Sequence, residues 1–447
     1  MTLRCSAILL ILATCHLVAQ PTLTGSPASG EQMRFDPTGS GVAPSGDGWE
    51  ITVWMQDDND DTSLPDDFRR WWHFQVEGLD PAGETLHFRI TNAPHTEIIL
   101  PAWSRSTDGE TFGDSERVPL SGLPAYVGGG VHEFTLTTDP GVVAIRVAKY
   151  FPHTLAMHEA FRASVISDPR LTEEVIGTTA MGLPIRLWTI TDPSTPSEGK
   201  RRVWVHAAVH PSETTAHFTA MGLVEFLLSG EPMADALLQS VIFNIVPMAN
   251  PDGVSVGNYR TTSTSVELER QWTPPYDSTA EEIVAMRTKI EELMGTVETP
   301  GSNPIEILLN LHSAHSAYPF HFRHVPNFNI DGTGVIPEVH DLEQRWIDLF
   351  MARSPDFVGR GATSNSTLGN AQWRPFVESM MHDRWSSDPE WSGPLVMAIT
   401  FEGTYFNGPG DRAWNTPDDY RDAGHAMGLA IADFFEITVP PTGVMVR

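Results

Sequence analysis

The sequence predicts an α/β domain whose mixed, mostly parallel sheet carries helices on both faces, preceded by an all-β sandwich domain. Residues 49–155 contain short runs of alternating apolar and polar residues, separated by turn residues. Such runs are typical of sandwich strands. Over residues 156–437, continuous apolar runs alternate with amphipathic helical patterns, as in a parallel sheet covered on both sides. A chain of 447 residues is long enough for both domains.

Residues 1–19 have the pattern of a secretory signal peptide. Arg4 supplies a positive start, residues 7–18 are almost continuously apolar, and Ala19 provides a small residue at the expected cut. We therefore predict cleavage near Ala19 and a secreted or periplasmic protein. An uncleaved N-terminal membrane anchor is the alternative.

Cysteine content and charge exclude several kinds of chemistry. Both cysteines, Cys5 and Cys15, lie in the predicted signal peptide, so the mature chain would have neither disulfides nor thiolate ligands. A bound metal ion would need His, Asp or Glu side chains. The formal net charge of −29 disfavours nucleic acids and anionic membranes as partners.

Residues 20–48 are rich in Gly, Pro, Ser and Thr and are predicted to be a linker or disordered. In the sandwich, the run from Asp57 to Asp61 (DDNDD) could suggest a calcium loop. It lacks the glycine and the distal glutamate of a helix–loop–helix calcium site. We predict a solvated acidic hairpin tip instead.

The second domain is predicted from nine segments, five strands and four helices, with a helical connection before them and a tail after them. Residues 156–172 look helical and join the two domains, and residues 438–447 form a C-terminal tail. The predicted strands are 184–190, 203–209, 241–247, 305–311 and 395–401, and the predicted helices are 214–229, 280–294, 340–353 and 421–436.

The first candidate ligands lie just after the strand at 203–209. His210 and Glu213 occupy the loop between this strand and the next helix. Ligand sites of open α/β sheets gather at the carboxyl ends of strands. Imidazole and carboxylate are both metal ligands, and a His-x-x-Glu pair can bind one ion from a single turn of backbone.

Later strands end in side chains that could complete such a site. His312 follows the strand at 305–311, with the competing histidines His315, His321 and His324 close behind. Glu402 follows the strand at 395–401, where a carboxylate could act as a general base. Arg260 and Arg270, behind the Asn-Pro-Asp-Gly turn at 250–253, could polarise a carbonyl or hold a carboxylate.

Six motifs in this order resemble the zinc carboxypeptidase family, the carboxypeptidase A-like metallopeptidases. Within it, the sequence is most similar to the cytosolic carboxypeptidase group, whose animal members trim glutamates from tubulin tails and which carries a β-sandwich before the catalytic domain. The resemblance covers roughly residues 50 to 437. The motifs are His210-Pro211-Ser212-Glu213, Asn250-Pro251-Asp252-Gly253, Gly257-Asn258-Tyr259-Arg260, Leu268-Glu269-Arg270-Gln271-Trp272, Leu311-His312-Ser313 and Thr400-Phe401-Glu402-Gly403.

The resemblance implies a zinc carboxypeptidase-like catalytic domain over residues 156–437 and a role for each matched residue. One Zn²⁺ would be bound by His210, Glu213 and His312. Glu402 would be the general base and Arg260 would stabilise the oxyanion. Arg270, with Asn258 and Glu269 beside it, would bind the substrate. Glu267 would replace the family's aspartate behind a ligand histidine.

Two positions depart from the family pattern. Glu269 replaces the usual Asn, and its charge would repel a substrate carboxylate or neutralise Arg270 unless it points away. The usual loop tyrosine is missing between Tyr318 and Tyr405, where His382 is the nearest substitute by position. Candidates for a pocket that binds an acidic side chain are Arg323, Arg360, Arg374 and Arg384.

The sequence thus predicts a secreted zinc-dependent metallocarboxypeptidase-like hydrolase that cleaves the C-terminal amide bond of a peptide or peptide-like substrate. One alternative is an amide hydrolase or deacylase of the same fold that acts on non-standard C-termini. Another is an inactive protein that binds zinc or peptide.

Overall fold

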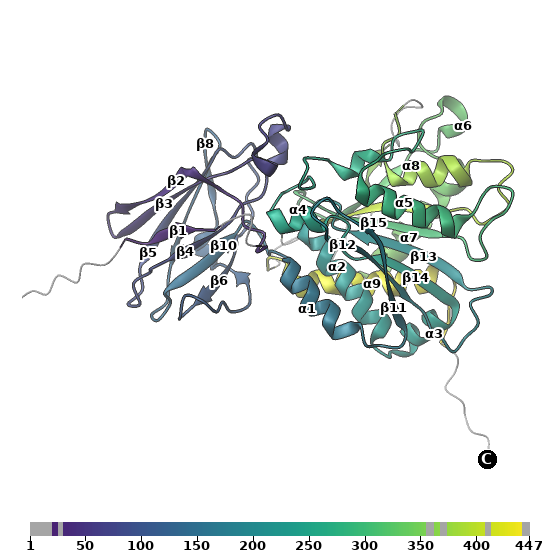
Figure 1. Cartoon of the computed structure of the whole chain (residues 1–447), viewed down its shortest axis with the longest axis horizontal. Coiled ribbons are helices and arrows are strands. Elements are labelled where there is room, and N and C mark those ends of the chain that lie inside the picture. The colour runs from purple at the N-terminus through teal and green to yellow at the C-terminus, as the bar shows by residue number, and fades with distance from the viewer. Residues whose placement is uncertain (1–19, 26–29, 355–361, 367–372, 407–412, 440–447) are drawn as a thin grey trace, which may run out of the picture.

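The computed structural model describes residues 20–25, 30–354, 362–366, 373–406 and 413–439. A β-rich part and an α/β part lie side by side (Figure 1). The β-rich part is a sandwich of two five-stranded sheets, ordered β1-β4-β10-β6-β7 and β2-β3-β5-β9-β8. Its strands are β1 (Thr22–Thr24), β2 (Asp36–Ser45), β3 (Gly48–Trp54), β4 (His73–Glu77), β5 (Thr85–Thr91), β6 (Ala102–Ser106), β7 (Glu116–Arg117), β8 (Ala125–Gly128), β9 (Val131–Thr137) and β10 (Ala144–Ala148).

The two sheets of the sandwich share one apolar core. Along β5 every second side chain is buried, as the alternating sequence predicts. Phe74 of β4 and Phe88 of β5 meet across the core with ring centroids 5.7 Å apart. The predicted sandwich is therefore present.

The prediction that residues 20–48 are a linker or disordered is wrong for the described part of that range. β1 pairs with β4, and β2 pairs with β3 at the edge of its sheet. Edge strands face solvent on several sides, so these segments lack the apolar alternation that marks an inner strand. Gln32 and Phe35, between the two strands, are buried.

The α/β part is built on an eight-stranded sheet ordered β11-β12-β14-β13-β15-β18-β16-β17. The pairs β14–β13, β13–β15, β15–β18 and β16–β17 are parallel, and the other three are antiparallel. The predicted mixed, mostly parallel sheet is confirmed. The strands are β11 (Leu171–Thr178), β12 (Pro184–Ile190), β13 (Arg201–Ala207), β14 (Val241–Val246), β15 (Ile307–Ala314), β16 (Phe320–His324), β17 (Ala362–Ser366) and β18 (Met397–Thr404).

Helices cover both faces of this sheet, as predicted. One face packs against α1 (Leu155–Val165), α2 (Thr214–Leu228), α3 (Pro232–Ser240), α7 (Pro337–Arg353) and α9 (Pro417–Phe434). The other face packs against α5 (Glu281–Met294) and α8 (Val377–Met381). None of the described helices is long and apolar enough to cross a membrane.

One predicted element is shorter in the structure. The helix predicted over 156–172 is α1, which ends at Val165, and β11 already begins at Leu171. Pro169 lies between them, and the residue before a proline disfavours the helical conformation.

Candidate functional site

Three buried side chains converge at the carboxyl edge of the sheet. His210 and Glu213 come from the loop between β13 and α2, and His312 comes from β15. The Glu213 carboxylate lies 2.8 Å from Nδ1 of each histidine, and the two Nδ1 atoms lie 3.1 Å apart. One ligand atom from each residue lies within 4.8 Å of the others. The structure thus brings together the three predicted metal ligands, and we call His210, Glu213 and His312 the metal cluster.

The outer nitrogens of both rings face carboxylates. Nε2 of His210 lies 2.9 Å from Glu267, and Nε2 of His312 lies 3.2 Å from Glu269. A carboxylate that accepts a hydrogen bond from Nε2–H keeps the proton on that nitrogen, which leaves the Nδ1 lone pair of a neutral imidazole free. Two such lone pairs and the Glu213 carboxylate then face one point. This donor set fits a zinc ion.

The backbone that carries His210 is held by the Asn-Pro-Asp-Gly turn. Ala208 has a φ of 61°, so the chain leaves β13 in a strained conformation. The backbone N–H of Asn250 donates to the carbonyl of Ala208 at 3.1 Å, and its side chain donates to that of Val209 at 3.2 Å. The same side chain caps α4 (Pro251–Val256). The Asn-Pro-Asp-Gly turn therefore supports the loop that carries His210 and Glu213.

The carboxylate of Glu269 contacts Asn310 and His312. Its two oxygens accept hydrogen bonds from Asn310 Nδ2 at 3.0 and 3.2 Å, and one of them faces His312. Arg270 pairs with Glu267 instead, through Nε at 3.1 Å, and its side chain is 48% exposed. Glu269 therefore supports His312 and leaves the Arg270 side chain open to solvent.

Glu402 lies beside the metal cluster. His312 and Glu402 are register partners on the parallel strands β15 and β18. Burial, followed by the negative charge of Glu213, raises the pKa of Glu402 to about 8. The next residue, Gly403, allows β18 to approach α2, because a Cβ there would lie 2.2 Å from Thr215 Oγ1.

Arg260 lies close to two carboxylates of the site, Glu213 and Glu267. Its guanidinium lies 3.9 Å from Glu213 and 3.8 Å from Glu267, and its Cζ lies 5.0 Å from the ring centre of Phe68. Phe68 belongs to the sandwich. The β-rich part therefore contributes directly to the surroundings of the metal cluster.

The DDNDD segment also belongs to these surroundings, and the prediction of a solvated hairpin tip is wrong for Asp58. This side chain is 1% exposed. Its carboxylate accepts hydrogen bonds from the backbone N–H groups of Tyr259, Arg260 and Thr261 at 2.7 to 2.8 Å. The partners lie about 200 residues further along the chain. Only the folded arrangement of the two parts reveals this contact.

A cavity of about 230 Å³ opens at the metal cluster. Seven of the nine predicted site residues line it, namely His210, Glu213, Arg260, Glu269, Arg270, His312 and Glu402. Sequence reasoning gave no role to Phe322, Phe376, Glu378 and Thr400, and it named His324 only as a competing ligand. These residues complete the lining.

Several predicted residues lie elsewhere. Asn258, predicted to bind substrate, is fully buried, and its amide donates to Asn59 Oδ1 and Thr262 O at 2.9 Å. This role is corrected, because Asn258 holds the backbone near Arg260 and does not line the cavity. His382 also does not line the cavity, and its Nε2 accepts a hydrogen bond from the backbone N–H of Ile336. The candidate arginines of an acidic-side-chain pocket lie outside the lining as well: Arg323 contacts His340, Arg374 contacts Asp383, and Arg384 contacts Glu291. Arg360 lies outside the described residues.

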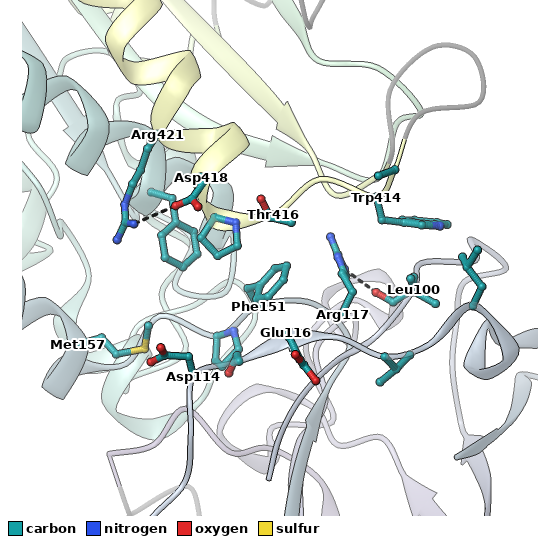
Figure 2. Close-up of a pocket in the computed structure, with 17 residues that line it drawn as sticks. Leu100, Asp114, Glu116, Arg117, Phe151, Met157, Trp414, Thr416, Asp418 and Arg421 are labelled. Carbon is teal, nitrogen blue, oxygen red and sulfur yellow. Dashed lines mark hydrogen bonds and ion pairs between the residues drawn. The ribbon is translucent and has the colours of Figure 1, made fainter. Parts of the chain in front are cut away.

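A larger hollow of about 1220 Å³ lies between the sandwich and the start of α9 (Figure 2). Arg117 extends from the sandwich into this region and donates to the carbonyls of Leu100 and Asn415. Its guanidinium also stacks over Phe151, 4.7 Å from the ring centre. The hollow shares no lining residue with the metal cavity, so Arg117 serves the junction between the two parts.

Comparison with known proteins agrees with this geometry. The family described as "Zinc carboxypeptidase" matches residues 157–356. Cytosolic carboxypeptidase 6 of Mus musculus is 28% identical over 221 residues, which span 46% of this chain and 40% of the relative. Cytosolic carboxypeptidase-like protein 5 of Homo sapiens is 30% identical over 281 residues, 53% of this chain and 31% of the relative. The chain thus spans less than half the length of these curated relatives.

Solved structures share the fold over nearly the whole chain. A metallo-carboxypeptidase from Burkholderia cenocepacia superposes with a TM-score of 0.70 at 22% identity, covering 93% of this chain and 99% of its own. The covered share includes the sandwich as well as the α/β part.

The predicted secreted or periplasmic location is contradicted. The finding that overturns it is that the similar curated proteins are named cytosolic carboxypeptidases. The signal peptide predicted at residues 1–19 lies outside the described residues.

The matched residues 157–356 contain the buried His–Glu–His cluster, and the similar curated proteins are carboxypeptidases as well. The chain therefore contains a zinc carboxypeptidase domain, which the family model matches over residues 157–356.

Proposed function

We propose that this chain is a zinc-dependent metallocarboxypeptidase that hydrolyses the amide bond before a free C-terminal carboxylate. One observation carries the proposal. The His210–Glu213–His312 cluster, the carboxylate of Glu402 and the guanidinium of Arg260 line a single cavity. Metal-assisted amide hydrolysis uses a Lewis acid, a base and an anion stabiliser around one reacting carbonyl group.

The zinc ion would be held by His210, Glu213 and His312, with one ligand atom from each. A zinc ion bound by two histidines and a glutamate polarises carbonyl groups and lowers the pKa of water toward neutrality. Glu267 and Glu269 would fix the orientation of the two imidazole rings by accepting hydrogen bonds from their Nε2–H groups.

Three further cavity residues, Glu402, Arg260 and Arg270, would each have a separate role in hydrolysis. Glu402 would accept the proton of the attacking water and pass it to the leaving amine. Arg260 would place its guanidinium at the oxygen that becomes negative in the transition state. Arg270, half exposed at the cavity, would pair with the terminal carboxylate of the substrate.

The contacts of Glu269 support a free carboxylate as the substrate end. The sequence had raised an amidated or otherwise non-standard end as an alternative, because Glu269 could repel a carboxylate. Its oxygens are engaged by Asn310 and His312, so the repulsion that motivated the alternative is reduced.

The test is hydrolysis by the purified full-length chain. We expect one zinc ion per chain by metal analysis and release of the last residue from peptides with a free C-terminus. C-terminally amidated copies of the same peptides should be cleaved at least about 100-fold more slowly, because Arg270 loses its partner. Chelation should abolish activity and zinc should restore it. Zinc binding without release of any residue would reject the proposal in favour of a binding protein.

Replacing Glu269 by glutamine is expected to weaken zinc binding about 10- to 100-fold, because His312 loses the acceptor at Nε2. Competition with a chromophoric chelator measures this independently of activity. Glu267→Gln should have a similar effect through His210. Glu282→Gln, at a buried glutamate on α5 outside the cavity, is the matched control. An unchanged zinc affinity in Glu269→Gln would show that Glu269 has another role.

A further inference from the structure

The buried end of the metal cavity contains a carboxylate that the proposed reaction does not use. Glu378, on α8, is 3% exposed and lines the cavity together with the buried residues His324, Thr400 and Glu269. We call these four residues the buried end of the cavity. Phe322 and Phe376, which are partly exposed, form its apolar walls.

Only one oxygen of Glu378 has a hydrogen-bond partner among the described residues. Thr400 Oγ1 donates to Oε1, whereas Oε2 is buried and unpaired. Thr400 is in turn fixed by Asn310 Nδ2 at 3.1 Å. The carboxylate is therefore held in place with one oxygen unsatisfied, an arrangement that buried polar groups rarely adopt without a ligand.

The cationic groups around the cavity are already paired with other carboxylates. Arg260 lies near Glu213, and Arg270 pairs with Glu267. His324 Nδ1 lies 2.6 Å from Glu343 Oε1. Glu378 thus has no ion-pair partner within 4 Å among the described residues. Its charged neighbours are a second carboxylate, Glu269, and His324, which already pairs with Glu343.

The raised pKa of Glu378 shows that its negative charge is not fully compensated by neighbouring groups. Burial, together with the negative charge of Glu269, raises the pKa of Glu378, although the neighbouring His324 acts in the opposite direction. A bound ammonium or guanidinium group would also lower this pKa and would supply donors for Oε2. A carboxylate entering the same place would add a third negative group to a buried site.

On the basis of the proposed function, we propose that the buried end of the cavity binds the cationic side chain of a C-terminal lysine or arginine residue. Arg270 would hold the terminal carboxylate at the open side, and the aliphatic part of the side chain would pass between Phe322 and Phe376. Glu378 would be the specificity-determining residue, with Glu269 contributing to the negative potential.

The first test compares peptides that differ only in the last residue: lysine, arginine, methionine or glutamate. With the zinc-loaded full-length chain, we expect kcat/KM for lysine or arginine to exceed that for methionine at least about 10-fold and that for glutamate at least about 100-fold. A chain that cleaves the glutamate peptide as well as the lysine peptide would overturn the inference while leaving the carboxypeptidase proposal intact.

The second test assigns the preference to Glu378. Glu378→Gln should lower the ratio of kcat/KM for lysine over methionine at least about 10-fold. Glu282→Gln should retain the wild-type ratio, because it removes a buried carboxylate elsewhere. A wild-type ratio in Glu378→Gln would overturn the assignment.

A binding measurement separates this inference from the proposed hydrolysis. If none of the four peptides is cleaved, the carboxypeptidase proposal fails. Calorimetric titration of the zinc-loaded wild-type chain and Glu378→Gln with free L-arginine, L-lysine and L-glutamate then decides the inference. Tighter binding of the two cationic amino acids, lost in the variant, supports a cation site, whereas equal or tighter binding of L-glutamate rejects it.

Discussion

Replacing Glu402 by glutamine is expected to lower kcat at least about 1,000-fold while the chain retains its zinc ion. The substitution keeps the size of the side chain but removes the group that accepts a proton, and general-base catalysis contributes roughly 10²- to 10⁴-fold to such reactions. Glu402 is register partner to His312 and lines the metal cavity. Steady-state kinetics and metal analysis on the same preparation measure both parts of the prediction.

The pH profile gives a second readout of the same residue. Burial and the charge of Glu213 raise the pKa of Glu402 to about 8, whereas a bound zinc ion lowers it by its positive charge. Activity should therefore fall as the pH drops through a value below 8, because the protonated carboxyl cannot accept the proton of water. The residual activity of Glu402→Gln should lack this acid limb.

Two further variants serve as controls for Glu402→Gln. Glu402→Asp keeps a carboxylate at a shorter reach and should retain more activity than Glu402→Gln. Glu282→Gln controls for the loss of a buried glutamate elsewhere in the fold. If Glu402→Gln kept its zinc and turned over within about threefold of the wild-type rate, Glu402 could not be the base.

The three ligand residues were predictable from the sequence because their spacing along the chain and the order of the strands both place them at one edge of the sheet. His210 and Glu213 share one loop after a strand, and His312 lies at the end of the neighbouring parallel strand. Carboxyl ends of parallel strands meet at one edge, so the convergence of these three side chains followed from the predicted element order.

Side-chain direction, by contrast, was not predictable from the sequence. Glu269 follows Glu267 by two residues, yet the two carboxylates support different histidines, His210 and His312. Asn258 carries a polar side chain two residues before Arg260, but its amide donates hydrogen bonds to Asn59 and Thr262 and does not reach the cavity. Rotamer and partner choice depend on the packed structure.

Long-range partners explain the remaining errors. β1 and β2 gain their backbone hydrogen bonds from strands that come later in the chain, so their own composition resembled a linker. Glu378 lies on the short helix α8, which has no motif of its own. Its significance depends on Thr400 and on the cavity, both of which appear only in the fold.

Replacing Asp58 by asparagine is expected to lower kcat/KM about 10- to 100-fold, although Asp58 belongs to the sandwich and touches no substrate. Its carboxylate fixes the backbone of Tyr259, Arg260 and Thr261 through three N–H groups. An asparagine side chain offers one oxygen in place of two, and its NH₂ group would face N–H donors. A displacement of about 1 Å of a catalytic group can cost roughly 100-fold in rate.

A double-mutant cycle distinguishes positioning of Arg260 from general loss of stability. Arg260→Gln alone should lower kcat/KM by roughly 10²- to 10³-fold, because it removes the anion stabiliser. If Asp58 acts through Arg260, adding Asp58→Asn to Arg260→Gln should cost less than about threefold more. Independent effects that multiply in the double variant would contradict the positioning role.

The same loop provides the control for this cycle. Asp60 lies two residues from Asp58, and its side chain is 67% exposed where it pairs with Arg34. Asp60→Asn should therefore leave kcat/KM within about twofold of wild type, since exposed ion pairs contribute little. Loss of activity in Asp58→Asn, together with normal zinc content and an unaffected Asp60→Asn, would give the sandwich a defined part in catalysis: it holds the backbone of the arginine that faces the metal cluster.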